Sequence, residues 1–180
     1  DVQKVLRLFV DQDPKLVWEK YHEKNESADA NVKFRLESLF NADFRNSTGG
    51  GVLDEIPEEI YIPWVMEDKD KRMEAVISWM QVFEGAEDIP TWSPKFVEFI
   101  DTFVDNPKHL ESLFSRITSG SWTGNYSDLL ETRRNQLSSL YDLSNNPYVK
   151  QWLNQRIANM KHDITTQRRH DANLKASYMT

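Results

Sequence analysis

One short phrase recurs along the chain and marks the positions where helices are expected to begin. Asp105-Asn106-Pro107 returns as Asn145-Asn146-Pro147, and the related phrase Gln12-Asp13-Pro14 occurs near the start. An Asn or Asp side chain accepts hydrogen bonds from the orphan N–H groups of a helix start, and Pro fits the first helical turn because it has no N–H. Each phrase is therefore predicted to be a tight turn that leads into a new helix.

Amphipathic stretches flank these turns. The first apolar stripe has the i, i+3, i+4, i+7, i+8 spacing of one helix face and consists of Val2, Val5, Leu6, Phe9 and Val10. A later stripe consists of Val149, Leu153, Ile157, Met160 and Ile164. The only β-rich phrase, Ile60-Tyr61-Ile62, is followed by Pro63, which should kink or restart a helix. We therefore expect an all-α fold.

The spacing of the turns predicts a helical repeat. Helix starts at Pro107 and Pro147 lie about forty residues apart, which is the spacing of HEAT-type repeats. Three consecutive glycines, Gly49 to Gly51, cannot lie inside a helix and indicate a flexible loop or insertion near residues 45–55. We therefore predict a single helical-repeat domain over residues 1–180, a HEAT-like α-solenoid of about four antiparallel helix pairs.

Composition excludes several kinds of chemistry. The chain of 180 residues has no cysteine, which rules out disulfides, thiolate zinc sites and Cys nucleophiles, and which favours a reducing cytoplasm. It has no apolar run of about 18 residues, so we expect no membrane span. Its net charge of −7 argues against a surface built for nucleic acid. No Gly-rich loop ends in Lys-Ser or Lys-Thr, so we expect no nucleotide cofactor.

Four phrases carry a family resemblance. They are Ile56-Pro57 with Trp64, Ser119-Gly120-Ser121-Trp122-Thr123-Gly124, Glu131-Thr132-Arg133-Arg134, and Asn146-Pro147-Tyr148-Val149-Lys150-Gln151-Trp152. Through them the stretch from Ile56 to Arg169 resembles the C-terminal helical-repeat portion of large multidomain bacterial proteins. The resemblance implies a HEAT-like solenoid with an accessory recognition or scaffolding role.

Exposed aromatic and clustered cationic residues are the candidates for partner binding. Trp92 and Trp122 lie in predicted loops, where an exposed Trp serves as a partner anchor. The alternative is that each ring packs between helix pairs, which the glycines beside Trp122 favour. The pairs Arg133-Arg134 and Arg168-Arg169 suit phosphate or an acidic peptide. Arg133 lies on an apolar stripe, so a pair with a buried carboxylate is a rival use.

His162-Asp163 and His170-Asp171 are the residues that suit catalysis best. Paired His and Asp side chains bind metal ions that activate water for phosphoester hydrolysis. Residues eight positions apart on one helix are separated by about 12 Å along its axis, which is too far for one metal ion. We therefore interpret them as solvated surface and predict no metal site and no catalytic residues.

These observations lead to one main hypothesis and two rivals. We expect a non-enzymatic scaffold or recognition module that binds a protein partner or other domains of a larger parent chain, because stacked helix pairs leave an extended face. The first rival is a nucleic-acid binder that uses the basic last helix, and salt-dependent DNA affinity would favour it. The second rival is a metal-dependent phosphohydrolase, which a metal analysis would detect.

Overall fold

The computed structural model describes residues 2–27, 29, 31–32, 52–84, 91–118 and 124–178. Helix accounts for 84% of the described residues and strand for 3%, so the all-α prediction is confirmed. The contacts divide the chain into two compact units, Asp1–Phe96 and Val97–Thr180. No helix in the described ranges is both long enough and apolar enough to cross a bilayer.

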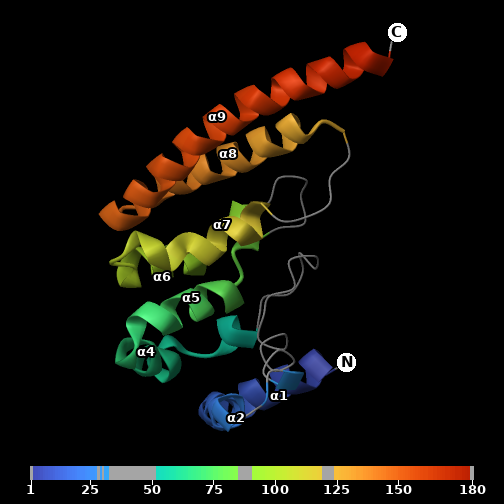
Figure 1. The fold of residues 1–180 in the computed structure, drawn as a ribbon. Coiled ribbons are helices and arrows are strands. Elements are labelled where there is room, and N and C mark those ends of the chain that lie inside the picture. Colours follow the sequence, from blue (N-terminus) through green and yellow to red (C-terminus); the bar gives the residue numbers. More distant parts are fainter. Residues whose placement is uncertain are drawn as a thin grey trace. The chain divides into compact units, whose positions relative to one another are not determined.

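The first unit is built from short helices and one small hairpin (Figure 1). Its elements are α1 (Val2–Gln12), α2 (Pro14–Ser27), the 3-10 helix η1 (Val52–Glu55), α4 (Glu58–Glu67), α5 (Lys69–Trp79), and the antiparallel strands β1 (Phe83–Glu84) and β2 (Thr91–Trp92). Helix α6 (Pro94–Phe103) begins in this unit and continues into the second.

Five aromatic rings from α2, α4 and α5 form a cluster in the first unit. Trp18 and Tyr21 come from α2, Tyr61 and Trp64 from α4, and Trp79 from α5. The Trp18 and Trp64 rings meet edge to face at 5.5 Å, and Trp64 stacks on Trp79 at 6.1 Å. Tyr21 meets Trp79 edge to face at 5.6 Å. Aromatic pairs with this geometry add stabilisation beyond the area that they bury.

Local expectations in the first unit are met only in part. Helix α4 continues through Pro63, so of the two expected effects, a kink or a restart, the restart is wrong. Pro63 is exposed, and water can reach the backbone carbonyl that its missing N–H would otherwise have paired. Of the first apolar stripe, Val10 is buried whereas Val5 and Phe9 are 51% and 61% exposed, although α1 contacts η1 and α2. The expected loop or insertion near 45–55 falls largely outside the described residues.

The end of that expected loop is ordered as η1. Val52 and Leu53 are fully buried there, and the Asp54 carboxylate accepts a hydrogen bond of 2.9 Å from the backbone N–H of Gln81. The Asp54 carbonyl also accepts a hydrogen bond of 2.6 Å from the Lys95 ammonium. Two apolar side chains and two tertiary hydrogen bonds therefore hold the segment, where the neighbouring glycines suggested flexibility.

The second unit contains the rest of α6, the 3-10 helix η2 (Pro107–Leu110), α7 (Glu111–Thr118), α8 (Tyr126–Leu143) and α9 (Pro147–Tyr178). Figure 1 shows α9 lying along α8, and these two helices share the most extensive packing in the unit. The buried stripe of α9 includes Val149, Leu153, Met160 and Ile164, as predicted, and the facing side of α8 buries Leu137 and Leu140.

The predicted Asx-Pro turns are confirmed. Asp13 accepts a hydrogen bond of 2.9 Å from the N–H of Leu16, where α2 begins at Pro14. Asn106 accepts one of 3.1 Å from the N–H of Lys108, where η2 begins at Pro107. The third turn, at Asn146, has the same local cap in front of α9.

Asn146 also makes contacts that the sequence did not predict. Its side-chain oxygen accepts from the N–H of Tyr148 at 2.8 Å, which is the expected cap. Its side-chain nitrogen donates to the carbonyls of Asp101 and Val104 at the end of α6, at 3.0 and 2.7 Å. One buried amide therefore joins the start of α9 to the end of α6, because its oxygen accepts while its nitrogen donates two hydrogens.

Candidate functional site

The seam between α8 and α9 changes from apolar to polar along its length. On α9 the buried stripe ends at Ile164, and the next positions on the same face are Gln167 and Asp171, both partly exposed. On α8 the stripe of Leu137 and Leu140 leads back to Ser127, which is buried. The seam is therefore polar toward the start of α8.

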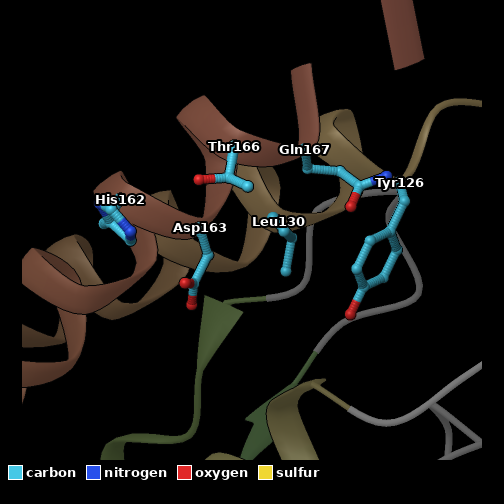
Figure 2. A pocket seen from close by; sticks show the side chains of 6 residues that line it. All are labelled: Tyr126, Leu130, His162, Asp163, Thr166 and Gln167. Carbon is cyan, nitrogen blue, oxygen red and sulfur yellow. The ribbon is translucent and has the colours of Figure 1, made fainter. Parts of the chain in front are cut away.

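A pocket of about 330 Å³ lies at this polar end of the seam. Its volume is at the lower end of the range of ligand pockets, about 300–1,000 Å³. Two α8 residues and four α9 residues line it (Figure 2): Tyr126, Leu130, His162, Asp163, Thr166 and Gln167. Figure 2 shows that the side chains of Tyr126, Leu130 and Asp163 extend to the same side of the two helices.

Asp171 binds the lining residue Gln167 and the nearby start of α8. One carboxylate oxygen accepts a hydrogen bond of 2.9 Å from the Gln167 side-chain nitrogen, and the other accepts one of 3.4 Å from the backbone N–H of Ser127. Hydrogen bonds from the Ser127 side chain and from Gln167 lower the pKa of Asp171 below its ordinary value. Asn125 precedes α8, but its side chain caps no backbone N–H. The Asp171 carboxylate instead lies at the N-terminus of α8, where the helix dipole favours a negative charge.

The four arginines proposed for partner binding do not form one site. The Glu131 carboxylate accepts from Arg134 at 3.4 Å and also pairs with Arg168. Arg133 instead donates to the Gln136 side-chain oxygen at 3.1 Å, and its partial burial lowers its pKa. Arg169 is exposed.

The partners of these arginines reduce the cationic character of this face. The Glu131 carboxylate pairs with the guanidinium groups of both Arg134 and Arg168, and its negative charge lowers the positive potential around them. The rival use expected for Arg133, a buried carboxylate, is not observed among its described contacts, because its partner is a neutral amide. The basic last helix therefore offers a weaker anion site than the sequence suggested.

The expectation of an exposed Trp92 is wrong. Its side chain is 6% exposed, its ring lies 4.5 Å from that of Phe83, and it stacks on Phe96 at 6.0 Å. The physical reason is the pairing of β1 with β2, in which Phe83 stands opposite Trp92, so that two large rings share one face. Trp122 lies outside the described residues.

The two His-Asp pairs have different surroundings. His162 and Asp163 both line the pocket, whereas His170 is an exposed residue of α9 and Asp171 binds Ser127 and Gln167. Within the described part of the chain, no group of three or more His, Cys, Asp or Glu residues is arranged to hold a metal ion.

Sequence reasoning assigned none of the six pocket residues to a site. It considered His162 and Asp163 but interpreted them as solvated surface, and it did not single out Tyr126, Leu130, Thr166 or Gln167. A signal for them was present in the spacing, because Tyr126 and Leu130 are separated by one helical turn, as are His162 and Thr166. The replacement of apolar by polar residues after Ile164 also marked the end of the seam where the pocket lies.

Comparison of the chain with protein-family models, with curated proteins and with solved structures finds no match. The resemblance to helical-repeat segments of bacterial proteins therefore stays a prediction from the sequence.

Proposed function

We propose that the chain is a non-catalytic helical-repeat recognition module that binds a protein partner, or another part of a larger parent chain, at the pocket between α8 and α9. The observation that carries the proposal is the composition of this pocket. Four of its residues bring polar side chains from successive turns of one helix, while Tyr126 and Leu130 add aromatic and aliphatic surface. A few placed polar groups on a partly apolar lining are typical of recognition sites.

Two features support a HEAT-like arrangement of antiparallel helix pairs. Ser127 contacts Asp171, and Glu131 contacts Arg168. The residue number therefore increases along α8 while that of the partner on α9 decreases, as in an antiparallel pair. The Asx-Pro caps in front of α2, η2 and α9 provide a recurring turn between consecutive helices. Stacked pairs of this kind expose an extended face suited to long protein segments.

The relation between His162 and Asp163 favours binding over catalysis. Consecutive residues on a helix point in directions about 100° apart, so the imidazole and the carboxylate do not face each other as a base and its orienting acid would. Both can still contact different atoms of one bound segment. The proposal of a non-enzymatic role rests on this geometry.

A selection with matched blocking variants tests the proposal. Phage-displayed random 12-residue peptides would be selected on the wild-type chain and then screened against Thr166→Trp and Thr165→Trp. Both threonines are exposed on α9, but only Thr166 lines the pocket. We expect peptides that bind wild type and Thr165→Trp but lose at least about tenfold in affinity for Thr166→Trp, since a bulky ring fills the space that they need.

Two results would contradict the proposal. If the selected peptides tolerate Thr166→Trp as well as Thr165→Trp, recognition does not use the pocket. If the purified chain hydrolyses a phosphoester and His162→Gln abolishes that activity, the site is catalytic. A far-ultraviolet circular dichroism spectrum of each variant shows whether the helices are preserved.

A further inference from the structure

We infer that the ligand of this pocket is an arginine side chain presented by the partner. The inference rests on the proposed function and specifies its chemistry. Three properties of the pocket support it: the sign of its charge, the fixed direction of one acceptor, and the pairing of aromatic with aliphatic surface.

The charge of the lining favours a cation. Asp163 is the only carboxylate among the six lining residues, and no Lys or Arg is among them. Its side chain extends to the side of the helices that Tyr126 and Leu130 share (Figure 2). Asp163 is exposed, so it attracts a cation through water, and the apolar surface of Tyr126 and Leu130 on the same side reduces the screening. The net charge of −7 also favours approach of a basic partner.

Gln167 supplies a second acceptor whose direction is fixed by chemistry. An ionised carboxylate only accepts hydrogen bonds, so Gln167 must present its NH₂ group to Asp171, at 2.9 Å. The lowered pKa of Asp171 keeps that carboxylate ionised. The amide oxygen must then point the other way, and Figure 2 shows it directed toward the space between Leu130 and Tyr126. The pocket thus presents acceptors from positions 163 and 167, together with the Thr166 hydroxyl.

The spacing of these acceptors suits guanidinium better than ammonium. Side chains four residues apart on a helix are separated by about 5–6 Å at Cβ, so they can receive donors on two edges of one planar group. Guanidinium has five donors in a rigid plane and stacks on aromatic faces, whereas ammonium is a compact, strongly hydrated charge. Tyr126 offers the aromatic face, and Leu130 offers apolar surface for the aliphatic stem.

The neighbouring arginines of the chain itself do not occupy this position. Arg134 and Arg168 both pair with Glu131, and neither is among the residues that line the pocket. Among the residues that the structure describes, no Lys or Arg of the chain lines the pocket, so its acceptors can receive a guanidinium from a partner.

The test uses a small arginine probe on the complete chain. N-acetyl-arginine amide would be titrated into ¹⁵N-labelled protein and followed by the backbone amide signals of α8 and α9. The citrulline and lysine counterparts are the comparison probes, because citrulline keeps the shape of arginine without its charge. We expect saturable shifts centred on residues 126–130 and 162–167, and at least about tenfold weaker binding of citrulline, since charge-assisted hydrogen bonds are about twice as strong as neutral ones.

A pair of variants separates the pocket from general electrostatics. Asp163→Asn removes the pocket carboxylate, and Asp142→Asn removes an exposed carboxylate of α8 that does not line the pocket. Both change the net charge equally. We expect Asp163→Asn to weaken arginine binding by about tenfold or more and Asp142→Asn to leave it nearly unchanged.

The outcomes distinguish the inference from the function on which it rests. Equal binding of arginine and citrulline, equal effects of the two variants, or a preference for lysine would overturn the inference. If pocket-dependent peptides are selected but none needs a basic residue, the arginine ligand is refuted while partner recognition stands. If the arginine probe binds but no pocket-dependent peptide is found, partner recognition fails instead.

Discussion

Replacing Asn146 with Ala should destabilise the second unit far more than an ordinary surface change. Asn146 is 8% exposed. Its oxygen accepts from the N–H groups of Tyr148 and Val149 at 2.8 and 3.3 Å, and its nitrogen lies 2.7 Å from the carbonyl of Val104 and 3.0 Å from that of Asp101. Ala removes all of these hydrogen bonds and adds none.

The magnitude follows from the separate losses. Removing an Asn cap costs about 1 kcal/mol. An amide nitrogen has two hydrogens, and losing two hydrogen bonds to backbone carbonyls costs about 1 kcal/mol each, or more where the carbonyl stays buried and unsatisfied. The expected loss in free energy of unfolding is therefore about 3 kcal/mol, a large part of the stability of a small domain.

Asn145→Ala is the matched control, because the same substitution is made at the adjacent, exposed residue. The backbone N–H of Asn145 donates to the Asp101 carboxylate at 2.7 Å, and this hydrogen bond survives the change. We expect the control to lie within about 0.5 kcal/mol of wild type. Asn146→Asp keeps the acceptor of the cap but loses both donors, so it should still cost about 2 kcal/mol or more.

The assay is urea unfolding followed by circular dichroism, with free energies obtained by linear extrapolation. Hydrogen exchange of the Tyr148 and Val149 amides measures the cap directly. The reasoning is refuted if Asn146→Ala and Asn145→Ala are equally stable, or if Asn146→Asp behaves like wild type. The second result would mean that the amide donors to the end of α6 contribute nothing.

Three further predictions concern other parts of the chain. Pro147→Ala should change the urea midpoint little, because Pro147 starts α9 and has no N–H to lose, whereas Leu153→Pro should cost about 3 kcal/mol or more by interrupting a helix interior. Trp92→Ala should cost about 3–5 kcal/mol in the same assay, because it empties a buried aromatic site. The pKa of Asp171 is lowered in the folded state, so its stabilisation is present above the unfolded value of about 3.9 and is lost as the pH falls through the folded value. The difference in melting temperature between wild type and Asp171→Asn should therefore close below about pH 4, and a difference independent of pH would contradict this.

Local chemistry was predictable from the sequence. An Asx cap depends on contacts two or three residues away, so the starts of α2, η2 and α9 followed from the Asx-Pro phrases alone. The buried stripe of α9 followed from its spacing for the same reason. By contrast, the contacts of the Asn146 nitrogen join residues more than forty positions apart, and no local pattern encodes them.

The candidate site was only partly predictable. His162 and Asp163 were recognised as chemically active residue types, but their position beside Tyr126 and Leu130 depends on how α8 lies against α9. The exposure of Trp92 was mispredicted because its burial depends on the pairing of β1 with β2. Strands of two residues are too short to show an alternating sequence pattern. The exposure of Val5 and Phe9 shows the converse error, since an apolar stripe predicts a helix face but not what covers it.

The aromatic cluster of the first unit has a spectroscopic consequence. The Trp64 ring lies 5.5 Å from Trp18 and 6.1 Å from Trp79. Tyr61 adjoins Trp18, and Tyr21 adjoins Trp79. Rings this close share their electronic excitation, so the first unit should show coupled near-ultraviolet dichroism and rapid energy migration among its indoles. Trp152, a buried indole of α9 in the second unit, belongs to none of these pairs. The chain therefore contains an intrinsic optical label by which melting of its first unit can be followed without any added dye.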